Sequence, residues 1–540
     1  MRMQTEMQLP HACWPPRARH LNDICKAGRG MKVYIHPVSL QRDLNLTEEQ
    51  VQLYKAIVNN NQTAMRLSQL GRRVVRFRWG VVEPSHPDGW MYGHWISHLG
   101  EENIVQDFER ADICFLPIWD YALCTAVGDL GIDLKTLNAH QSQTLFETCS
   151  RQVQLYRWLF QQPAWQRSHG ADHVFFRTYK DRLSRSGRKA PKDNRTRSAG
   201  YAIVANSILV TPEDRHADVE LRRGCTTVVV PYWSSTDKWG MPLNSSFEQM
   251  RAQKGQLISF IGNRKGKKCH LEYTPKPACP KNSGPDLAGH VRSMLLKSLS
   301  NSSASSRTAI ELNGKSPAVL GDKPAAALIR TVFCPCPLGD SYTTKRLFTA
   351  VLSMCIPIII SDRIQLPFPD AIPWTDMVLQ VPEDDIRLGK VDIVKFAQEV
   401  PPARVLRLQH ALWSARPKVE YAARRAGDAT DLMIDELQQA RSCMRPVLVQ
   451  RLGVSSCMHG VTFGLEPPQK ASASPPRLWV LNHCEGLFTL FVNGRVCLPG
   501  VCEEVRCPPT GTRALVRKQF CAVGELRGWS EPLRAWKKSA

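Results

Sequence analysis

The chain has 540 residues, which is too long for one ordinary domain and predicts two folded domains with extensions. Apolar residues make up 43% of the sequence and charged residues 22%, so the composition argues against a chain that is disordered throughout. Lys and Arg outnumber Asp and Glu by 71 to 49, and this net charge of +22 favours anionic partners: nucleic acid, phosphate-bearing molecules or acidic glycans.

The N-terminus lacks the usual signals for membrane insertion. No run of 18 or more apolar residues occurs in the sequence, so we expect no transmembrane helix. Pro10, Pro15 and Pro16 interrupt the first residues, without the apolar stretch that is typical of a signal peptide. Residues 1–30 are therefore predicted to form an irregular extension.

Short apolar runs alternate with helix-compatible stretches over residues 31–235. Residues 144–160 have apolar positions near helical spacing and predict a helix. The runs that predict strands are residues 32–36, 111–117, 171–176, 202–204 and 226–231. Most of these runs are continuous rather than alternating, as expected for strands of a parallel sheet that is covered on both faces. Residues 31–235 are therefore predicted to form an α/β domain.

A second alternation begins at residues 257–262, and residues 236–440 are predicted to form a second α/β domain. Within it, Thr331–Cys334 predicts a strand, a tight loop follows, and residues 343–354 predict a helix. Ile356–Ile360 is the next buried strand, which we expect to be a central strand of the sheet.

This strand–loop–helix–strand unit predicts a phosphate site. Ligands bind beyond the carboxyl ends of the strands in such units, and the N–H groups and positive dipole end of a helix N-terminus favour phosphate. The candidate contacts for a pyrophosphate are Gly339, Asp340, Ser341, Thr343, Thr344 and Arg346. Asp340 and Ser341 could instead only cap the helix, and the spacing leaves both interpretations open.

Five segments of this region occur in a specific order. They are Phe333–Ser341, Lys345–Phe348, Cys355–Asp362, Leu366–Phe368 and Trp374. In this order and spacing they resemble the signature of the exostosin family, glycosyltransferase family 47. Members carry a phenylalanine–cysteine–x–x–proline–x–glycine–aspartate loop, an arginine–leucine–phenylalanine helix, and a strand leading to leucine–proline–phenylalanine. Weaker similarity extends the match to about residues 31–440.

The resemblance implies a GT-B architecture, in which two Rossmann-like domains face each other across a cleft. It implies a nucleotide-sugar donor, such as a UDP-sugar, in the domain at 236–440 and a polysaccharide or glycoprotein glycan acceptor on the side of residues 31–235. It also implies transfer with inversion, which needs a base near the acceptor hydroxyl and positive charge at the departing diphosphate. No cofactor and no metal site are expected, although divalent metal dependence is left open.

The site residues fall into two groups. The candidates for the base are the Asp172–His173 pair and Asp120, which follows the strand at 111–117; each of them is also compatible with a purely structural role. The donor site would extend from the helix N-terminus to the end of the next strand, at Ser361, Asp362 and Gln365.

Two positions depart from the family pattern. Many members have arginine where Leu338 stands, and many have glutamate where Gln365 stands. A neutral amide accepts hydrogen bonds from ribose hydroxyls more weakly than a carboxylate does. These departures predict weaker or altered donor binding, and they keep open the alternative of a non-catalytic exostosin-like partner of an active transferase.

Residues 441–540 contain seven cysteines and lose the α/β rhythm, so we expect them to be poorly ordered apart from a helix near Asp431–Ser442. Another exostosin-like subunit is a possible partner. The family's localisation implies the Golgi apparatus and association with a membrane, although no anchor is visible in this chain. A basic nucleic-acid-binding protein is a further alternative, but the basic runs lack interleaved aromatics, so we expect no nucleic-acid partner.

Overall fold

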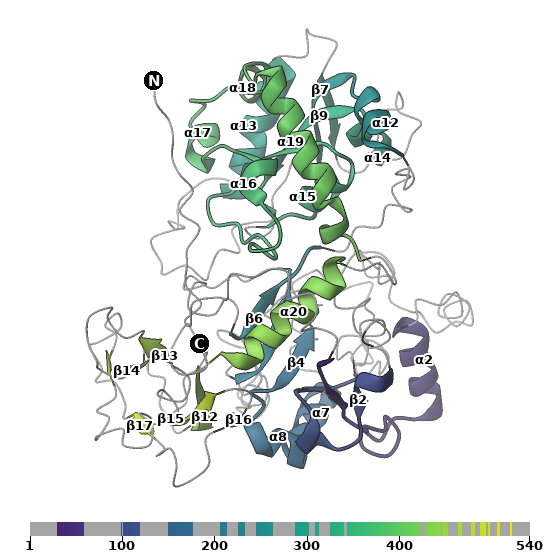
Figure 1. Cartoon of the computed structure of the whole chain (residues 1–540), viewed down its shortest axis with the longest axis vertical. Coiled ribbons are helices and arrows are strands. Elements are labelled where there is room, and N and C mark those ends of the chain that lie inside the picture. The colour runs from purple at the N-terminus through teal and green to yellow at the C-terminus, as the bar shows by residue number, and fades with distance from the viewer. Residues whose placement is uncertain are drawn as a thin grey trace. The chain divides into compact units, whose positions relative to one another are not determined.

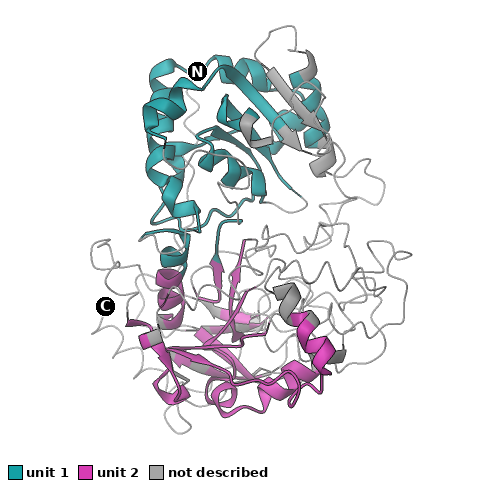
Figure 2. Ribbon diagram, turned by 90° about the vertical axis from the view of Figure 1, so that its right-hand side faces the viewer, with its two compact units in different colours: residues 1–9, 215–217, 229–433 teal, residues 10–214, 218–228, 434–540 magenta. Residues whose placement is uncertain are grey.

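The computed structural model places the chain in two compact units, unit 1 and unit 2 (Figures 1 and 2). The described residues of unit 1 lie within 229–433, and those of unit 2 lie within 10–214, 218–228 and 434–540. The residues that the structure describes are 30–58, 99, 101–118, 150–176, 206–212, 225–232, 245–262, 287–301, 308–312, 324–339, 343–421, 427–443, 445–451, 463–466, 477–480, 486–492, 495–496, 505–507 and 519–520. Within these ranges, no helix is long and apolar enough to cross a membrane.

Unit 2 is built on a six-stranded sheet in the order β2-β1-β3-β4-β5-β6. Its strands are β1 (Val33–Ile35), β2 (Ile104–Val105), β3 (Ile113–Phe115), β4 (His173–Phe176), β5 (Ile208–Thr211) and β6 (Thr227–Val229). The pairings from β2 through to β5 are parallel. Strands β3 to β6 are buried along their whole length, which is why their sequences are continuous apolar runs.

Three helices of the described part accompany this sheet: α2 (Glu48–Val58), α7 (Ser150–Phe160) and α8 (Pro163–Ser168). The expected strands at 32–36, 111–117, 171–176 and 226–231 are confirmed. The strand expected at 202–204 lies outside the described residues, and the sequence analysis missed β5, which follows a few residues later.

Unit 1 is built on a five-stranded, entirely parallel sheet in the order β11-β10-β9-β7-β8. Its strands are β7 (Gln256–Gly262), β8 (Thr308–Leu312), β9 (Thr331–Pro337), β10 (Ile356–Ile360) and β11 (Leu379–Gln380). Strand β10 pairs with β9 on one side and β11 on the other, so Ile356–Ile360 is an interior strand, as expected. The strand in the middle of the order is β9.

The helices of unit 1 join these strands and cover the sheet. They are α12 (Phe247–Ala252), α13 (Leu287–Asn301), α14 (Pro324–Ile329), α15 (Lys345–Leu352), α16 (Trp374–Met377), α17 (Glu383–Arg387), α18 (Ile393–Gln398) and α19 (Pro402–Ala415). Helix α15 packs on β9 and β10, and α13 packs on β8 and β9. Two parallel sheets with crossover helices give the chain an α/β fold of two Rossmann-like units, as expected. The exact domain boundaries and a cleft between the units stay predictions.

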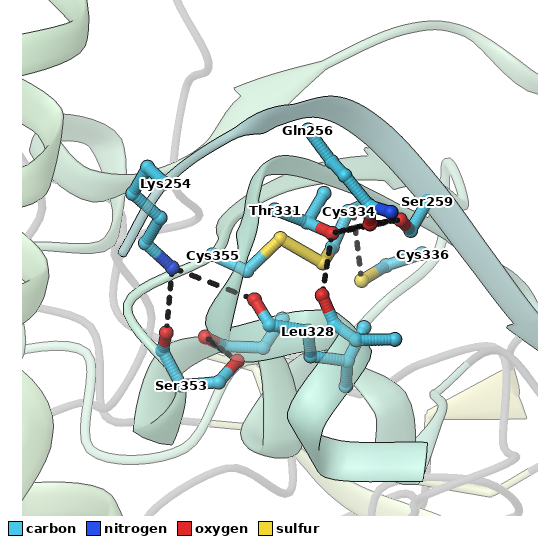
Figure 3. The surroundings of a disulfide bond; sticks show 11 residues. Lys254, Gln256, Ser259, Leu328, Thr331, Cys334, Cys336, Ser353 and Cys355 are labelled. Atoms are coloured by element: carbon cyan, nitrogen blue, oxygen red, sulfur yellow. Dashed lines mark hydrogen bonds between the residues drawn. A yellow bond between two sulfur atoms is a disulfide. The ribbon is translucent and has the colours of Figure 1, made fainter. Parts of the chain in front are cut away.

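Polar side chains close the amino-terminal end of the unit 1 sheet (Figure 3). A disulfide joins Cys334 of β9 to Cys355, which directly precedes β10, while Cys336 stays a buried free thiol. Lys254 Nζ donates to the carbonyl oxygens of Leu328 and Ser353, 3.4 and 2.8 Å away, at the last turns of α14 and α15. A lysine at two helix C-termini is stabilising when it is charged, but burial lowers the pKa of Lys254 to about 7. These contacts tie the helices to the amino-terminal end of the sheet, whereas ligands of such sheets bind beyond the carboxyl end.

Residues after 441 contain more structure than we expected. Helix α20 (Ala429–Ser442) is followed by β12 (Arg445–Arg451), which pairs antiparallel with β15 (Gly486–Val492). Strands β16 (Arg495–Val496) and β17 (Val505–Cys507) also pair with β15. A second antiparallel sheet contains β13 (Phe463–Glu466), β14 (Arg477–Val480) and β18 (Gln519–Phe520). The expectation of a poorly ordered tail was wrong for these strands.

Strand β12 is anchored on the six-stranded sheet of unit 2. Arg445 is 1% exposed and donates to the carbonyl oxygens of Ala171 and Ala440, both at 2.6 Å. The Asn206 amide donates to Leu448 O and accepts from Leu448 N, at 2.8 and 2.9 Å. A disulfide links Cys225, next to β6, to Cys443. The sequence did not show this docking because its contacts join residues more than 200 positions apart.

Asn206 offers a test of this docking. Asn206→Ala removes both hydrogen bonds to Leu448 and should destabilise β12 by about 1–3 kcal/mol, since buried backbone groups lose their partners. Hydrogen–deuterium exchange should therefore rise in residues 445–451 and 486–492, whereas β9 and β10 of unit 1 keep their protection. Unchanged exchange in both tail strands would contradict the docking.

Candidate functional site

Residues that follow three neighbouring strands meet at the carboxyl edge of the unit 1 sheet. The Leu338 N–H donates to Ile360 O at 3.1 Å, so the end of β9 lies beside the end of β10. The Val381 N–H donates to Ile359 O at 3.0 Å and brings in the end of β11. Gly339, Ser361 and Asp362 follow β9 and β10 directly, so this edge unites the segments that the sequence analysis assigned to a donor site.

Arg346 comes from the first turn of α15, the helix that follows β9. Its guanidinium lies over the ring of Phe260, 4.4 Å from the ring centre, two residues before the end of β7. Burial, with a smaller contribution from the charge of Arg292, lowers the pKa of Arg346 to about 10, against the opposing effect of Cys336. The side chain is therefore still a cation at neutral pH, and it lies at the carboxyl edge as expected.

A second cation, Arg292, lies at the same edge. It comes from α13, and its Nε and Nη2 donate to Leu338 O at 3.3 and 2.9 Å. The residue is only 8% exposed. The sequence analysis missed it, because a single arginine on an amphipathic helix has no motif around it.

The start of α15 is relevant to the alternative that Asp340 and Ser341 only cap this helix. The helix begins at Lys345 with Thr344 at the N-cap, where its side chain makes no capping hydrogen bond. Thr343 is buried just before it. Asp340 and Ser341 lie outside the described residues, so the capping interpretation and the phosphate interpretation both stay predictions.

Asp362 and Glu383 fix the loops after β10 and β11 through reciprocal hydrogen bonds. Asp362 N–H donates to Glu383 Oε1 at 2.8 Å, and Glu383 N–H donates to Asp362 Oδ1 at 3.1 Å. Burial raises the pKa of Glu383, partly offset by the bond from the Asp362 N–H. Asp362 thus has a positioning role at the start of α17. Ser361 is buried and Gln365 is half-buried in the same loop.

The predicted Asp172–His173 pair belongs to a buried network in unit 2. His173 Nδ1 lies 2.8 Å from Asp172 Oδ1, and His173 Nε2 lies 2.8 Å from His36 Nε2. The carboxylate also accepts hydrogen bonds from Arg167 and from the Ser168 hydroxyl. These side chains come from the end of β1, the start of β4 and helix α8.

Hydrogen-bonding logic fixes the tautomers in this network. A carboxylate can only accept, so His173 Nδ1 carries the hydrogen, and when both rings are neutral its Nε2 accepts from His36 Nε2–H. His36 Nδ1 then keeps a lone pair, and this buried atom has no hydrogen-bond partner among the described residues. Burial acts to raise the pKa of Asp172, but the bond from His173 and the charge of Arg167 outweigh it and hold the pKa well below its usual value.

The titratable side chains of this network are withdrawn from solvent. Asp172 and His173 are 0% exposed and His36 is 1% exposed. A base must come within hydrogen-bond distance of the hydroxyl from which it takes the proton. In this structure the buried pair contributes to the fold, and its role as the base stays a prediction that no contact of the described residues supports. Asp120, the other candidate, lies outside the described residues.

Cys114, Asp172 and His173 also place metal-ligand atoms within 4.8 Å of one another. Arg167 already compensates Asp172, and its Nη2 lies 3.8 Å from Cys114 Sγ. Burial, followed by the charge of Asp172, raises the pKa of the Cys114 thiol well above its ordinary value. A metal would need a thiolate here and would meet a guanidinium, so the surroundings of this cluster disfavour a cation.

Gly170 explains part of the sequence motif before β4. Its φ is +81°, which favours glycine, and a Cβ there would lie 2.2 Å from a ring carbon of Trp165. The Trp165 ring in turn packs on His173, with 4.8 Å between ring centres. The glycine thus lets a tryptophan cover the histidine and exclude water from the network.

The buried His36 predicts a pH dependence of stability. Burial, followed by the charge of His173, lowers the pKa of His36 to about 2, whereas an unfolded histidine titrates near 6.5. Below about pH 6.5 the unfolded chain binds a proton that the folded chain does not, so stability falls as the pH falls. By pH 5 the loss should reach about 2 kcal/mol.

His36→Gln keeps an N–H donor for His173 but cannot titrate, so it serves as the comparison. Denaturant unfolding of wild type and variant at pH 7.5 and 5.0 should show that the variant loses about 2 kcal/mol less across this range. The same pH dependence in both proteins would count against a neutral, buried His36.

The family model of the exostosin GT47 domain matches residues 27–395, more than half of the chain. The chain belongs to the exostosin GT47 family. The match covers both parallel sheets, so the resemblance that began with the segments around Gly339 extends over the α/β units.

Curated relatives are similar over shorter stretches. The probable β-1,4-xylosyltransferase IRX10L of Arabidopsis thaliana is 43% identical over 93 residues, which are 17% of this chain and 21% of that protein. The probable glucuronosyltransferase GUT1 of Oryza sativa subsp. japonica is 45% identical over 83 residues, 15% of this chain and 19% of that protein. The matched stretch thus spans about a fifth of the length of these relatives.

Among solved structures, Arabidopsis thaliana UGT89C1 complexed with UDP aligns over 76% of this chain and 100% of its own. The identity is 11% and the TM-score is 0.27. A similarity with so low a TM-score supports no conclusion about this exostosin GT47 chain.

Proposed function

We propose that the chain is a glycosyltransferase that moves a sugar from a nucleoside-diphosphate donor, a UDP-sugar, to a polysaccharide or glycoprotein glycan, with inversion. The observation that carries this proposal is the position of Arg346, a cation in the first turn of α15 at the carboxyl edge of a parallel sheet. Phosphates favour such a helix N-terminus. Membership of the exostosin GT47 family supports the same reaction class.

The reaction needs the following chemistry. The acceptor hydroxyl oxygen bonds to the anomeric carbon while the bond from that carbon to the diphosphate oxygen breaks. The diphosphate leaves with the electron pair, and cationic groups at the carboxyl edge of unit 1 stabilise its charge. The hydroxyl proton passes to a base. Asp172 and His173 are too deeply buried to be this base, so Asp120 is the candidate that we retain.

The relatives suggest which donors to test first. Their names describe a probable xylosyltransferase and a probable glucuronosyltransferase. UDP-xylose and UDP-glucuronic acid are therefore the first donors that we propose, with β-linked oligosaccharides as acceptors. A β-linkage made from an α-linked nucleotide sugar is the product of inversion.

We propose the Golgi apparatus, within the oxidising secretory pathway, as the location. The pairs Cys225–Cys443 and Cys334–Cys355 are in disulfide geometry, one in each unit. Disulfides persist in oxidising compartments and are rare in the cytosol. They support a secretory route independently of any targeting segment.

A second candidate function is that of a non-catalytic partner of an active exostosin-like subunit. Two observations favour it: the burial of Asp172 and His173, and the neutral amide of Gln365 where a carboxylate is common in the family. Such a protein would not transfer sugar without its partner subunit, whether or not it binds nucleotide.

A transfer assay on the full chain separates the two functions. The chain is incubated with each UDP-sugar and an oligosaccharide acceptor, and both released UDP and extended product are measured. Acceptor-dependent release with product formation is the result expected for the transferase. UDP binding without product from any donor would favour the partner subunit, and neither binding nor transfer would refute the donor site itself.

A further inference from the structure

Two arginines from different crossover helices converge at the carboxyl edge of unit 1. Helix α13 follows β7 along the chain, and α15 follows β9. Both helices therefore start at the carboxyl edge, because each follows a strand of the same parallel sheet. Arg292 and Arg346 lie in the first two turns of these helices.

Their contacts show that they are directed toward neighbouring strand ends. Arg292 donates through Nε and Nη2 to the carbonyl oxygen of Leu338, the residue that follows β9. Arg346 stacks on Phe260 of β7, the strand beside β9. The charge of Arg292 acts on Arg346 strongly enough to help lower its pKa.

We infer that Arg292 and Arg346 form one clamp, in which both guanidinium groups bind the diphosphate of the nucleotide donor. This inference rests on the proposed function. Bringing two cations together in a place that is largely withdrawn from water costs electrostatic energy, and a diphosphate between them offsets that cost. Planar guanidinium groups match phosphate oxygens in pairs of hydrogen bonds, which a lysine cannot do.

Arg292 has a second task in this clamp. The contacts of Nε and Nη2 with Leu338 O hold the turn after β9, and the clamp requires the remaining edge of the guanidinium to reach phosphate. Leu338 is 1% exposed and brings no charge to this position, where many family members have arginine. Arg292 supplies a cation at that residue from another helix.

The test compares nucleoside diphosphate with monophosphate. Calorimetric titration of the full chain with UDP and with UMP gives a ratio of dissociation constants for wild type, Arg292→Gln, Arg346→Gln and the double variant. Arg292→Lys keeps the charge and loses the paired hydrogen bonds. Lys297→Gln removes an exposed cation from the same helix and is the matched control.

The clamp predicts that Arg292→Gln and Arg346→Gln each weaken UDP binding at least tenfold more than UMP binding. Arg292→Lys should show an intermediate loss, the double variant should lose less than the product of the single losses, and Lys297→Gln should match wild type. If Arg292 were purely structural, its replacement would weaken the binding of UDP and UMP equally. That result would overturn the clamp but leave the donor site in place. Failure of wild type to bind any nucleoside diphosphate would refute the proposed function, and the clamp with it.

Discussion

Arg346→Ala is expected to weaken the binding of uridine diphosphate roughly tenfold to more than a hundredfold while both units stay folded. The side chain lies in the first turn of α15, over Phe260, and charge-assisted contacts to phosphate are worth about 1.5–3 kcal/mol. Gly339→Val should weaken binding more, because a branched side chain would obstruct the approach of the backbone after β9 to the phosphate. Gln365→Glu should leave the affinity for uridine diphosphate at the wild-type level or raise it.

Calorimetric titration of uridine diphosphate into wild type and the three variants checks this prediction. Lys345→Ala is the control, since Lys345 precedes Arg346 in the same helix turn and differs in the direction of its side chain. Equal affinity in wild type, Arg346→Ala and Gly339→Val would mean that the diphosphate binds elsewhere.

Asp172→Asn is expected to destabilise unit 2 by about 3–5 kcal/mol, because it leaves the Arg167 guanidinium without its buried counter-charge. With Oδ1 still accepting from His173 and Ser168, the amide would also place an NH₂ donor where Asp172 Oδ2 accepts from Arg167. Glu109→Gln is the matched control. Its carboxylate lies 3.9 Å from Arg167 but is 64% exposed, so its loss should change stability by less than about 1 kcal/mol.

Thermal unfolding and hydrogen exchange of β1, β3 and β4 measure this effect. The prediction distinguishes a structural Asp172 from a catalytic one. A catalytic carboxylate would give a variant that melts like wild type but no longer transfers sugar, and such a result would restore Asp172 to the list of possible bases.

The sequence was most informative where local pattern and burial agree. Ile356–Ile360 and Thr331–Cys334 could be predicted as strands, because continuous apolar runs bounded by a loop have few other uses in an α/β fold. The edge on which Gly339, Arg346 and Ser361 lie followed from the parallel order of these strands. The interior position of Ile356–Ile360 was also predictable, whereas the full strand order was not, because strand order depends on pairing between distant segments.

What the sequence could not show depends on contacts between segments that are far apart in the chain. Arg292 reaches the end of β9 from a helix 46 positions earlier, and nothing near it in the sequence indicates that contact. The anchoring of β12 by Asn206 spans 242 positions. Asp172 and His173 form a motif that looks chemically active, but only the fold shows that Trp165 and α8 cover it.

Hydrogen–deuterium exchange of the full chain, with and without saturating uridine diphosphate, tests the donor site most directly. The account predicts added protection in the peptides that contain Leu338 and Gly339, the first turns of α13 and α15, and Ser361 to Gln365. Strands β1, β3 and β4 of unit 2 should exchange as before. Protection confined to unit 2, or no protection anywhere at saturation, would contradict the assignment of the nucleotide to the carboxyl edge of the five-stranded sheet.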